Sequence, residues 1–253
     1  KDGLIESVAS DVPRLDYPLT NGVVGDCPHL LLEPLRTNII THSENFSDSS
    51  WVNIDTTETS SATTSPDGTV NAYKLTKSAA NGLIRTFISV SGDYTFSVFL
   101  KKDTLNYARL FIASSVESAS VYIDLDNGST GTEIGNPDGV KVEYYGNGWY
   151  KCSINKNVST ITNFRIYPAD GDNDTSGTSG SIFIYGAQLE QGSYATSYIP
   201  TIGLAETRLG DVCYNSGTSA EFNDSEGVLF AEIAFAESQS SSSHRISLSH
   251  GTT

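Results

Sequence analysis

Short stretches of alternating apolar and polar residues, each ended by a turn signal, dominate the sequence. They fall at residues 37–41, 70–77, 83–90, 94–101, 107–113, 119–126, 140–145, 149–155, 163–167 and 181–189. Between them lie turn sequences such as Pro-Asp-Gly at 66–68, Asn-Gly at 81–82 and Gly-Asn-Gly at 146–148. Successive side chains of a strand point to opposite faces, so this rhythm predicts an all-β jelly-roll β-sandwich with little helix.

One side of each predicted strand is rich in aliphatic residues and is expected to form the core. These residues are Tyr94, Phe96, Val98, Leu100, Leu110, Ile112, Val121, Ile123, Leu125, Tyr150, Cys152, Ile154, Phe164 and Ile166. The stretch 44–52 reads as a polar loop that carries Phe46 and Trp51. We expect these two rings to close one end of the core, with ligand stacking as the alternative.

The opposite sides of the same strands combine aromatic rings with charged groups. This set consists of Phe99, Arg109, Phe111, Tyr122, Asp124, Trp149, Lys151, Arg165 and Tyr167. Rings that stack on sugars, beside charged groups that bond hydroxyls, are what a glycan-binding surface needs. The alternative is that the N-terminal segment or a neighbouring subunit covers this face, because alternation defines sides but not exposure.

The charge balance restricts the partners. Thirty acidic residues against fifteen basic residues give a formal net charge of −15, which argues against binding of nucleic acid or an anionic membrane through a basic patch. No apolar run is long enough for membrane insertion, and the first residues lack the apolar stretch of a signal peptide. A polysaccharide or cell-surface glycan is the easier partner. The absence of methionine suggests a piece of a longer polypeptide.

Neither the cysteines nor the acidic loops predict a clear cofactor site. Cys152 falls on the core side of its strand and is expected to be a buried thiol, whereas a disulfide between Cys27 and Cys213 stays an alternative to free thiols. Asp170, Asp172 and Asp174 follow the alternating acidic start of a calcium loop, but Thr175 stands where a glycine is wanted. A solvated loop is the preferred interpretation, with a structural calcium ion as the alternative and no other cofactor.

The chain divides into three predicted regions. Residues 1–35 form an extended arm of proline-bounded apolar pieces, residues 36–200 form the sandwich, and residues 201–253 form a linker and an incomplete β segment. The last region holds only two predicted strands, at 227–236 and 244–249, which are too few to stand alone. They resemble the opening of a concanavalin-type lectin-like sandwich, so we expect a truncated second domain.

Several motifs resemble the jelly-roll carbohydrate-binding modules attached to xylanases and glucanases. They are Ser43-Glu44-Asn45-Phe46 with Trp51, the run at 66–75, the strand at 94–101 and the run Ile182 to Glu190. The resemblance covers about residues 36–200 and implies a carbohydrate-binding role. In the enzyme-borne relatives a carboxylate near the end of the last strand helps to hold a structural calcium. Here that place reads Tyr185-Gly186-Ala187.

A second set of motifs looks like the tail and receptor-binding proteins of bacteriophages. It comprises the runs 13–17, 27–38, 146–152, 186–190 and 195–201. This resemblance implies a location on a virion tail or outside the cell, with a homotrimer as an implied assembly. No convergent catalytic motif occurs, so we expect a non-catalytic binding module rather than an enzyme. The rivals are a purely structural trimeric tail component and the accessory module of a secreted polysaccharide-degrading enzyme.

Overall fold

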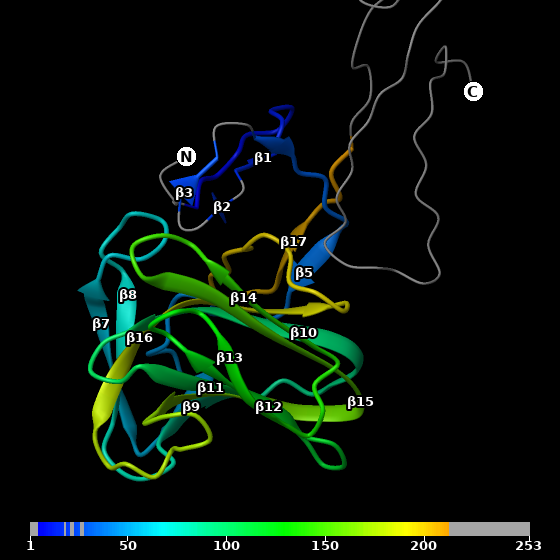
Figure 1. Ribbon diagram of the computed structural model, residues 1–253. Helices are drawn as coiled ribbons and strands as arrows, with labels where there is room; N and C mark the ends of the chain where they lie inside the picture. Colours follow the sequence, from blue (N-terminus) through cyan, green and yellow to red (C-terminus); the bar gives the residue numbers. More distant parts are fainter. Residues whose placement is uncertain (1–4, 18, 21–22, 26–27, 213–253) are drawn as a thin grey trace, which may run out of the picture. The chain divides into compact units, whose positions relative to one another are not determined.

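The computed structural model describes residues 5–17, 19–20, 23–25 and 28–212, and within these ranges the chain is built of β-strands without a helix (Figure 1). The strands are β1 (Leu15–Asp16), β2 (Leu19–Thr20), β3 (Val23–Val24), β4 (His29–Leu30), β5 (Arg36–Asn38), β6 (Trp51–Ile54), β7 (Thr56–Thr63), β8 (Ala72–Lys77), β9 (Leu83–Thr86), β10 (Val90–Lys102), β11 (Tyr107–Ser114), β12 (Ala119–Asp124), β13 (Thr130–Ile134), β14 (Gly139–Tyr144), β15 (Trp149–Ala169), β16 (Gly180–Gln191) and β17 (Glu206–Arg208). The predicted all-β fold is confirmed. The residues in these ranges form no helix that could cross a bilayer.

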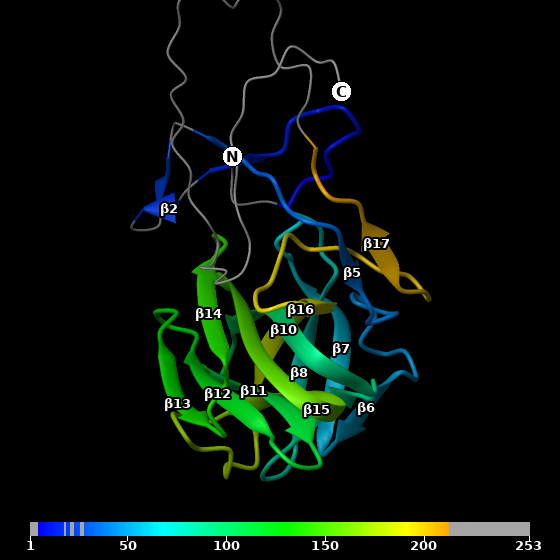
Figure 2. The same ribbon diagram turned by 90° about the vertical axis from the view of Figure 1, so that its right-hand side faces the viewer.

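The long strand β15 connects the two sheets of the sandwich and curves across it in Figure 2. Its first part pairs with β10 and β14, which gives a first sheet in the order β14-β15-β10-β16-β8-β7. Its second part pairs with β11 and β9, which gives a second sheet in the order β13-β12-β11-β15-β9-β6. The register shifts in both ladders near residues 158–163. Such irregularities bend a strand, which lets β15 serve both sheets.

The core between the two sheets contains the residues that alternation assigned to it. Phe96, Leu110 and Phe164 are 0% exposed, and Cys152 is a buried free thiol whose pKa is raised by burial. Phe46 and Trp51 close one end, with ring centroids 4.8 Å apart. The Trp51 Nε1–H donates to the His42 carbonyl at 2.9 Å. Both the core prediction and the closing role of these two rings are confirmed.

Within the two sheets, three strands escaped the sequence prediction. β7 and β13 carry mostly polar residues and lie at or near sheet edges, where one face is solvated and apolar alternation is not needed. β6 lies partly inside the stretch expected to be a loop, because its Trp51 packs inward while the rest stays half-buried. Residues 149–155 and 163–167, predicted as separate strands, belong to one strand that bends instead of turning.

The chain enters and leaves the sandwich through paired segments. β5 and β17 form an antiparallel pair in which Arg36 lies opposite Arg208 (Figure 1). The arm pairs with itself through β1 and β4, and its Ile5 N–H donates to the Pro66 carbonyl at 2.8 Å. The described residues between 5 and 212 belong to one compact unit. Cys27, Cys213 and the strands predicted at 227–236 and 244–249 lie outside the described residues.

Candidate functional site

The structure divides the predicted glycan-binding face between the two sheets. The three members on the first sheet are Phe99, Trp149 and Lys151. The six on the second sheet are Arg109, Phe111, Tyr122, Asp124, Arg165 and Tyr167. Because the first part of β15 belongs to the first sheet and its second part to the second sheet, these two groups form separate surfaces.

The first-sheet group is covered, which corrects its assignment as ligand-binding. Phe99 and Trp149 are each 1% exposed. The Phe99 ring contacts those of Tyr145 and Tyr198 edge to face, with centroids 5.0 and 5.8 Å away. The Trp149 Nε1–H donates to the Thr64 carbonyl at 3.0 Å. We call Phe99, Trp149, Tyr185 and Tyr198 the covered aromatic cluster. A ligand cannot reach these rings in this arrangement.

Lys151 lies under the same cover. Its ammonium group hydrogen bonds the Thr196 carbonyl and lies 6.0 Å from the centroid of the Phe99 ring. Burial lowers the pKa of this lysine from its usual value, with the carboxylates of Glu143, Glu190 and others opposing the shift. Its role here is to hold the segment that contains Thr196 against the sheet.

A polar rim borders the covered aromatic cluster. The Tyr185 hydroxyl lies 2.9 Å from a carboxylate oxygen of Glu44 and 2.9 Å from one of Asp67, and the Tyr198 hydroxyl donates to Glu44 at 3.1 Å. Burial and the Glu44 charge raise the pKa of Tyr185. The tyrosines therefore stay neutral donors, and their hydroxyls satisfy two carboxylates instead of facing a ligand.

Asp67 provides a pH-dependent part of this rim. Burial raises its pKa, but hydrogen bonds from Ser65, Thr69 and Asn71 outweigh this effect and hold the pKa well below its ordinary value of 3.8. A depressed carboxyl pKa stabilises the fold above the unfolded-state value and loses that stabilisation as the pH falls. We predict that Asp67→Asn lowers the free energy of unfolding at pH 7 by about 1–2 kcal/mol, after allowance for partial exposure.

Urea unfolding at several pH values tests this prediction. The difference between wild type and Asp67→Asn should shrink as the pH falls below about 4, because the unfolded wild-type chain then binds a proton at this carboxyl group while the folded protein still holds it ionised. Glu117→Gln, at an exposed position, serves as the control and should show a near-zero difference throughout. A difference for Asp67→Asn that stays constant over this range would contradict the assignment.

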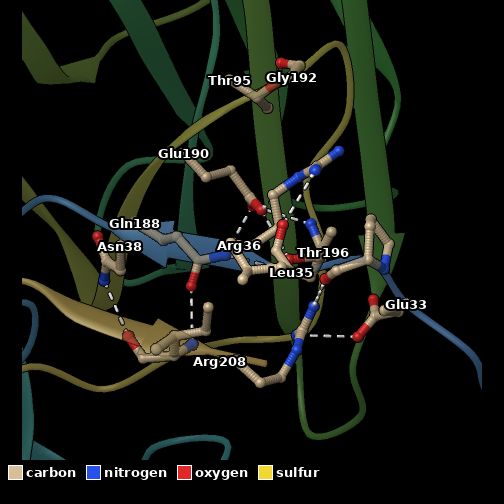
Figure 3. A network of polar contacts seen from close by, with 12 residues as sticks. Glu33, Leu35, Arg36, Asn38, Thr95, Gln188, Glu190, Gly192, Thr196 and Arg208 are labelled. Carbon is tan, nitrogen blue, oxygen red and sulfur yellow. Dashed lines mark hydrogen bonds and ion pairs between the residues drawn. The ribbon is translucent and has the colours of Figure 1, made fainter. Parts of the chain in front are cut away.

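A buried polar junction fixes the exit segment to the last strand, as Figure 3 shows. Glu190 is 0% exposed, and its carboxylate accepts hydrogen bonds from the Thr196 N–H at 2.8 Å, the Thr196 hydroxyl at 2.6 Å and the Gln188 side-chain amide at 2.6 Å. The Arg36 guanidinium lies 3.6 Å away. The junction is fully occupied by its own partners and leaves no place for a ligand.

The entry and exit segments meet beside this junction. Asn38 donates to the carbonyls of Ala187 and Ile199, and Arg208 pairs with Glu33 at 2.9 Å. Glu33 also pairs with Arg14 at 2.6 Å. Burial raises the pKa of Glu33, but Arg14 and Arg208 outweigh it and the pKa is lowered. These contacts are structural, since each charge already has its counterpart.

The second-sheet group contains arginines stacked on aromatic rings. The Arg109 guanidinium carbon lies 4.9 Å from the centroid of Phe111, 5.2 Å from that of Tyr122 and 5.4 Å from that of Tyr167. The Arg165 guanidinium carbon also lies 4.9 Å from the Phe111 centroid. Strand pairing explains the arrangement, because Arg109 lies opposite both Tyr122 and Tyr167, and Phe111 lies opposite Arg165.

The structure adds two residues that the sequence analysis missed, Arg85 and Phe87. Arg85 lies directly opposite Arg165 across the β9–β15 pair, and its guanidinium carbon is 4.5 Å from the centroid of Phe87. Phe87 is 55% exposed. Both residues belong to the predicted strand 83–90, to whose side chains no face was assigned, and only the pairing of β9 with β15 brings Arg85 opposite Arg165. We call Arg85, Phe87, Arg109, Phe111 and Arg165 the arginine face.

The remaining members of the second-sheet group have supporting positions. Tyr122 and Tyr167 are 3% and 5% exposed, beneath the arginines, so they support the surface rather than form it. Asp124 lies at the end of β12, where it accepts hydrogen bonds from the Tyr107 hydroxyl at 3.3 Å and the Asp126 N–H at 2.8 Å. The open part of the predicted face is thus smaller than expected and is shifted toward β9.

In the acidic loop after β15, for which a calcium site was the alternative to a solvated loop, each aspartate has its own protein partners. Asp170 forms an ion pair with Lys77 and accepts a hydrogen bond from the Gly177 N–H. Asp172 accepts hydrogen bonds from the backbone N–H and the hydroxyl of Thr132. Asp174 accepts a hydrogen bond from the Ser176 N–H. The three carboxylates thus serve different partners and do not converge. Groups of three potential metal ligands are absent from the described part of the chain as a whole.

A shallow groove of about 310 Å³ lies away from the arginine face. Its lining consists of His42, Glu44, Asn45, Ser60, Ser61, Asn71, Tyr73, Thr201 and Ile202. Tyr73 is 8% exposed, and its hydroxyl donates to Asn45 at 2.9 Å, so it offers no open ring for stacking. The arginine face is therefore the stronger candidate site.

Comparison with solved structures shows only distant similarity. Matches include the CBM22-1 and GH10 modules of Clostridium thermocellum endo-1,4-β-D-xylanase 10B complexed with xylohexaose, at 12% identity and TM-score 0.37, covering 66% of this chain and 30% of that chain. The enzymatically active domain of bacteriophage CBA120 tailspike protein 4 matches at 14% identity and TM-score 0.32, covering 60% and 21%. A carbohydrate binding module from Cellvibrio mixtus lichenase 5A, in complex with cellotriose, matches at 11% identity and TM-score 0.29, covering 62% and 96%.

These comparisons limit what can be transferred to this chain. It spans less than a third of the first two matched chains. No protein family profile matches the sequence, and no curated protein does so. The chain is thus distantly similar in structure to carbohydrate-binding modules and to a domain of a phage tailspike protein.

Proposed function

We propose that the chain is a non-catalytic carbohydrate-binding module that uses the arginine face to hold a glycan. The single observation that carries this proposal is the pair of phenyl rings, the exposed Phe87 and the half-buried Phe111, set among guanidinium groups on the outer side of a sheet. A flat aromatic ring packs against the apolar side of a sugar ring, and neighbouring N–H groups can bond the hydroxyls.

The chemistry of these groups supports binding rather than catalysis. Phenyl rings have no ionisable group, and guanidinium groups act as hydrogen bond donors without a lone pair to accept a proton. General acid–base catalysis needs a group that exchanges a proton near neutral pH. The centre of the arginine face offers stacking and positive charge only, which suits a binding module.

The biological setting that we propose follows from the sequence resemblance. The module acts on a virion tail or outside the cell, where it recognises a glycan of a bacterial surface. Several copies acting together raise the avidity of individually weak contacts. The accessory module of a secreted polysaccharide-degrading enzyme is the alternative setting for the same site.

Removal of the two rings tests the proposal. We predict that Phe87→Ala and Phe111→Ala each weaken glycan binding by about 1–2 kcal/mol, roughly five- to thirtyfold in Kd, because apolar contact with the sugar is lost. A glycan array first identifies a ligand, and titration calorimetry then compares the variants. Leu204→Ala removes a side chain that is 76% exposed and serves as the control.

A structural role is the second candidate, and exposed leucines of the arm and exit favour it. Leu15 and Leu30 lie opposite each other on β1 and β4 and are 48% and 50% exposed, and Leu209 is 75% exposed. Such apolar side chains are suited to a subunit contact. A negative glycan array, together with a trimer whose mass does not depend on concentration, would overturn the binding proposal in favour of this one.

A further inference from the structure

The six arginines among the described residues divide into two groups. Arg14, Arg36 and Arg208 each lie within ion-pair distance of a carboxylate. The other three, Arg85, Arg109 and Arg165, have no carboxylate partner in the part of the chain that the structure describes, and all three belong to the arginine face. In a sequence with twice as many acidic as basic residues, this separation demands a physical reason.

The three unpaired guanidinium groups are neighbours on one surface. Arg85 and Arg165 are directly opposite each other on paired strands, and the guanidinium carbons of Arg109 and Arg165 both lie 4.9 Å from the centroid of the Phe111 ring. Like charges at such positions repel each other. The contacts with aromatic rings offset part of this cost but bring no negative charge. A bound anion would remove the repulsion.

The hydrogen bonding of these groups is also incomplete. The buried Nε atoms of Arg85 and Arg109 have no hydrogen bond partner, and Arg85 donates no side-chain hydrogen bond to any described residue. Arg36 and Arg208 also leave Nε without a hydrogen bond, but both have a carboxylate as ion-pair partner. Arg109 uses one donor, to the Ser120 hydroxyl at 2.9 Å.

Arg165 is the most occupied of the three. Its guanidinium donates to the Asn163 side-chain oxygen at 2.5 Å and to the Tyr167 hydroxyl at 3.2 Å. A guanidinium that stacks by its flat side keeps its edge donors free for an acceptor. Across the arginine face, the donors that remain suit the oxygen atoms of anionic groups such as carboxylates and tetrahedral oxyanions.

We propose that the arginine face selects acidic saccharides, that is, glycans whose units carry a carboxylate or a sulfate group. The anionic group accepts hydrogen bonds from Arg85, Arg109 and Arg165, and the sugar ring packs on Phe87 or Phe111. This inference rests on the proposed carbohydrate-binding function and names its ligand class. Because the whole chain is strongly acidic, the attraction is local and depends on direct contact rather than on long-range steering.

The test compares matched ligands on the full 253-residue chain. Oligogalacturonates and oligoalginates are titrated beside the same oligosaccharides after reduction of their carboxyl groups, and heparin-derived oligosaccharides provide the sulfated arm. We expect at least one acidic series to bind roughly ten- to hundredfold more tightly than its neutral counterpart, the range expected for hydrogen bonds to a charged group. Which series binds identifies the anion. Raised salt should weaken the binding.

Variants connect the effect to the arginine face. Arg85→Gln and Arg165→Gln should each reduce the affinity for the acidic ligand roughly tenfold or more and leave that for the reduced ligand almost unchanged. Lys141→Gln removes the same charge from β14 in the first sheet and is the matched control. If Arg165→Gln does not fold, Arg85→Gln decides, since no hydrogen bond to a described residue is lost there.

The outcomes separate the two proposals. One outcome is that acidic and reduced ligands bind equally well, that the arginine variants do not change this affinity, and that Phe111→Ala lowers it. This outcome would contradict the acidic-saccharide inference and would support the proposed function. Binding of acidic ligands that Arg85→Gln does not weaken would place the anion elsewhere and also overturn the inference. An absence of binding to every glycan, acidic or neutral, would overturn both.

Discussion

Trp149→Ala should lower the free energy of unfolding by about 3–5 kcal/mol, the cost typical of removing a large buried aromatic side chain. Trp149 is 1% exposed, packs with Ala72, Phe99 and Tyr185 in the covered aromatic cluster, and donates to the Thr64 carbonyl. The substitution leaves a cavity and an unpaired carbonyl. Guanidinium-induced unfolding, followed by fluorescence and circular dichroism, measures the loss.

Phe87→Ala is the matched control for this prediction, because Phe87 is an aromatic residue that is 55% exposed. Its effect on stability should stay within about 0.5 kcal/mol, as is usual for surface positions. The two variants should therefore show opposite behaviour, with Trp149→Ala affecting stability and Phe87→Ala affecting binding. A stable Trp149→Ala protein that has lost glycan binding would mean that the cluster opens to the ligand and that its burial has been misassigned.

Glu190→Ala should have a similarly large effect, of about 3–5 kcal/mol, because it breaks a buried network that includes a charge. The Thr196 N–H, the Thr196 hydroxyl and the Gln188 amide would lose their acceptor inside the protein, and Arg36 would lose its counter-charge. Unpaired buried donors are expensive. Denaturant unfolding gives the total, and limited proteolysis shows whether residues 192–198 detach first.

Two further variants give this experiment its controls. Glu190→Gln keeps the size of the side chain and one oxygen acceptor, so it should cost less than Glu190→Ala. Glu206→Gln changes an exposed glutamate of β17 and should have an effect within about 0.5 kcal/mol. Equal stability of the Glu190→Ala and Glu206→Gln proteins would show that the polar junction does not hold the exit segment.

The inner side of the sandwich could be predicted because its residues follow a period of two. Phe96, Val98 and Leu100 illustrate this, since they stand at alternate positions of one strand and each is 0% exposed. The prediction failed where this pattern is absent. β7 consists largely of threonine and serine, and its strand structure comes from its pairing with β8, a contact between different parts of the chain. The bend of β15 likewise depends on its partners.

The site was harder to predict because alternation says nothing of what lies above a sheet. Phe99 and Phe111 have equivalent positions in their strands, yet Tyr145 and Tyr198 cover the first while the second stays half-buried. Arg85 was overlooked since its importance arises only from its position opposite Arg165. The three aspartates of the loop after β15 matched a metal motif in spacing, but their partners come from distant residues such as Lys77 and Thr132.

The pairing of β5 with β17 also determines how the module responds to tension. In this antiparallel pair Arg36 lies opposite Arg208, so the chain enters and leaves at the same end of the pair. A pull on the two connecting segments therefore opens the rungs one at a time, starting with the Asp211 N–H to Glu33 carbonyl bond and the Arg36–Arg208 rung. The strands of the sandwich bear the force only after this ladder has opened. When the chain is stretched, the β5–β17 pair is therefore expected to separate first, and the strands that carry the arginine face then keep their structure at forces that already open this pair.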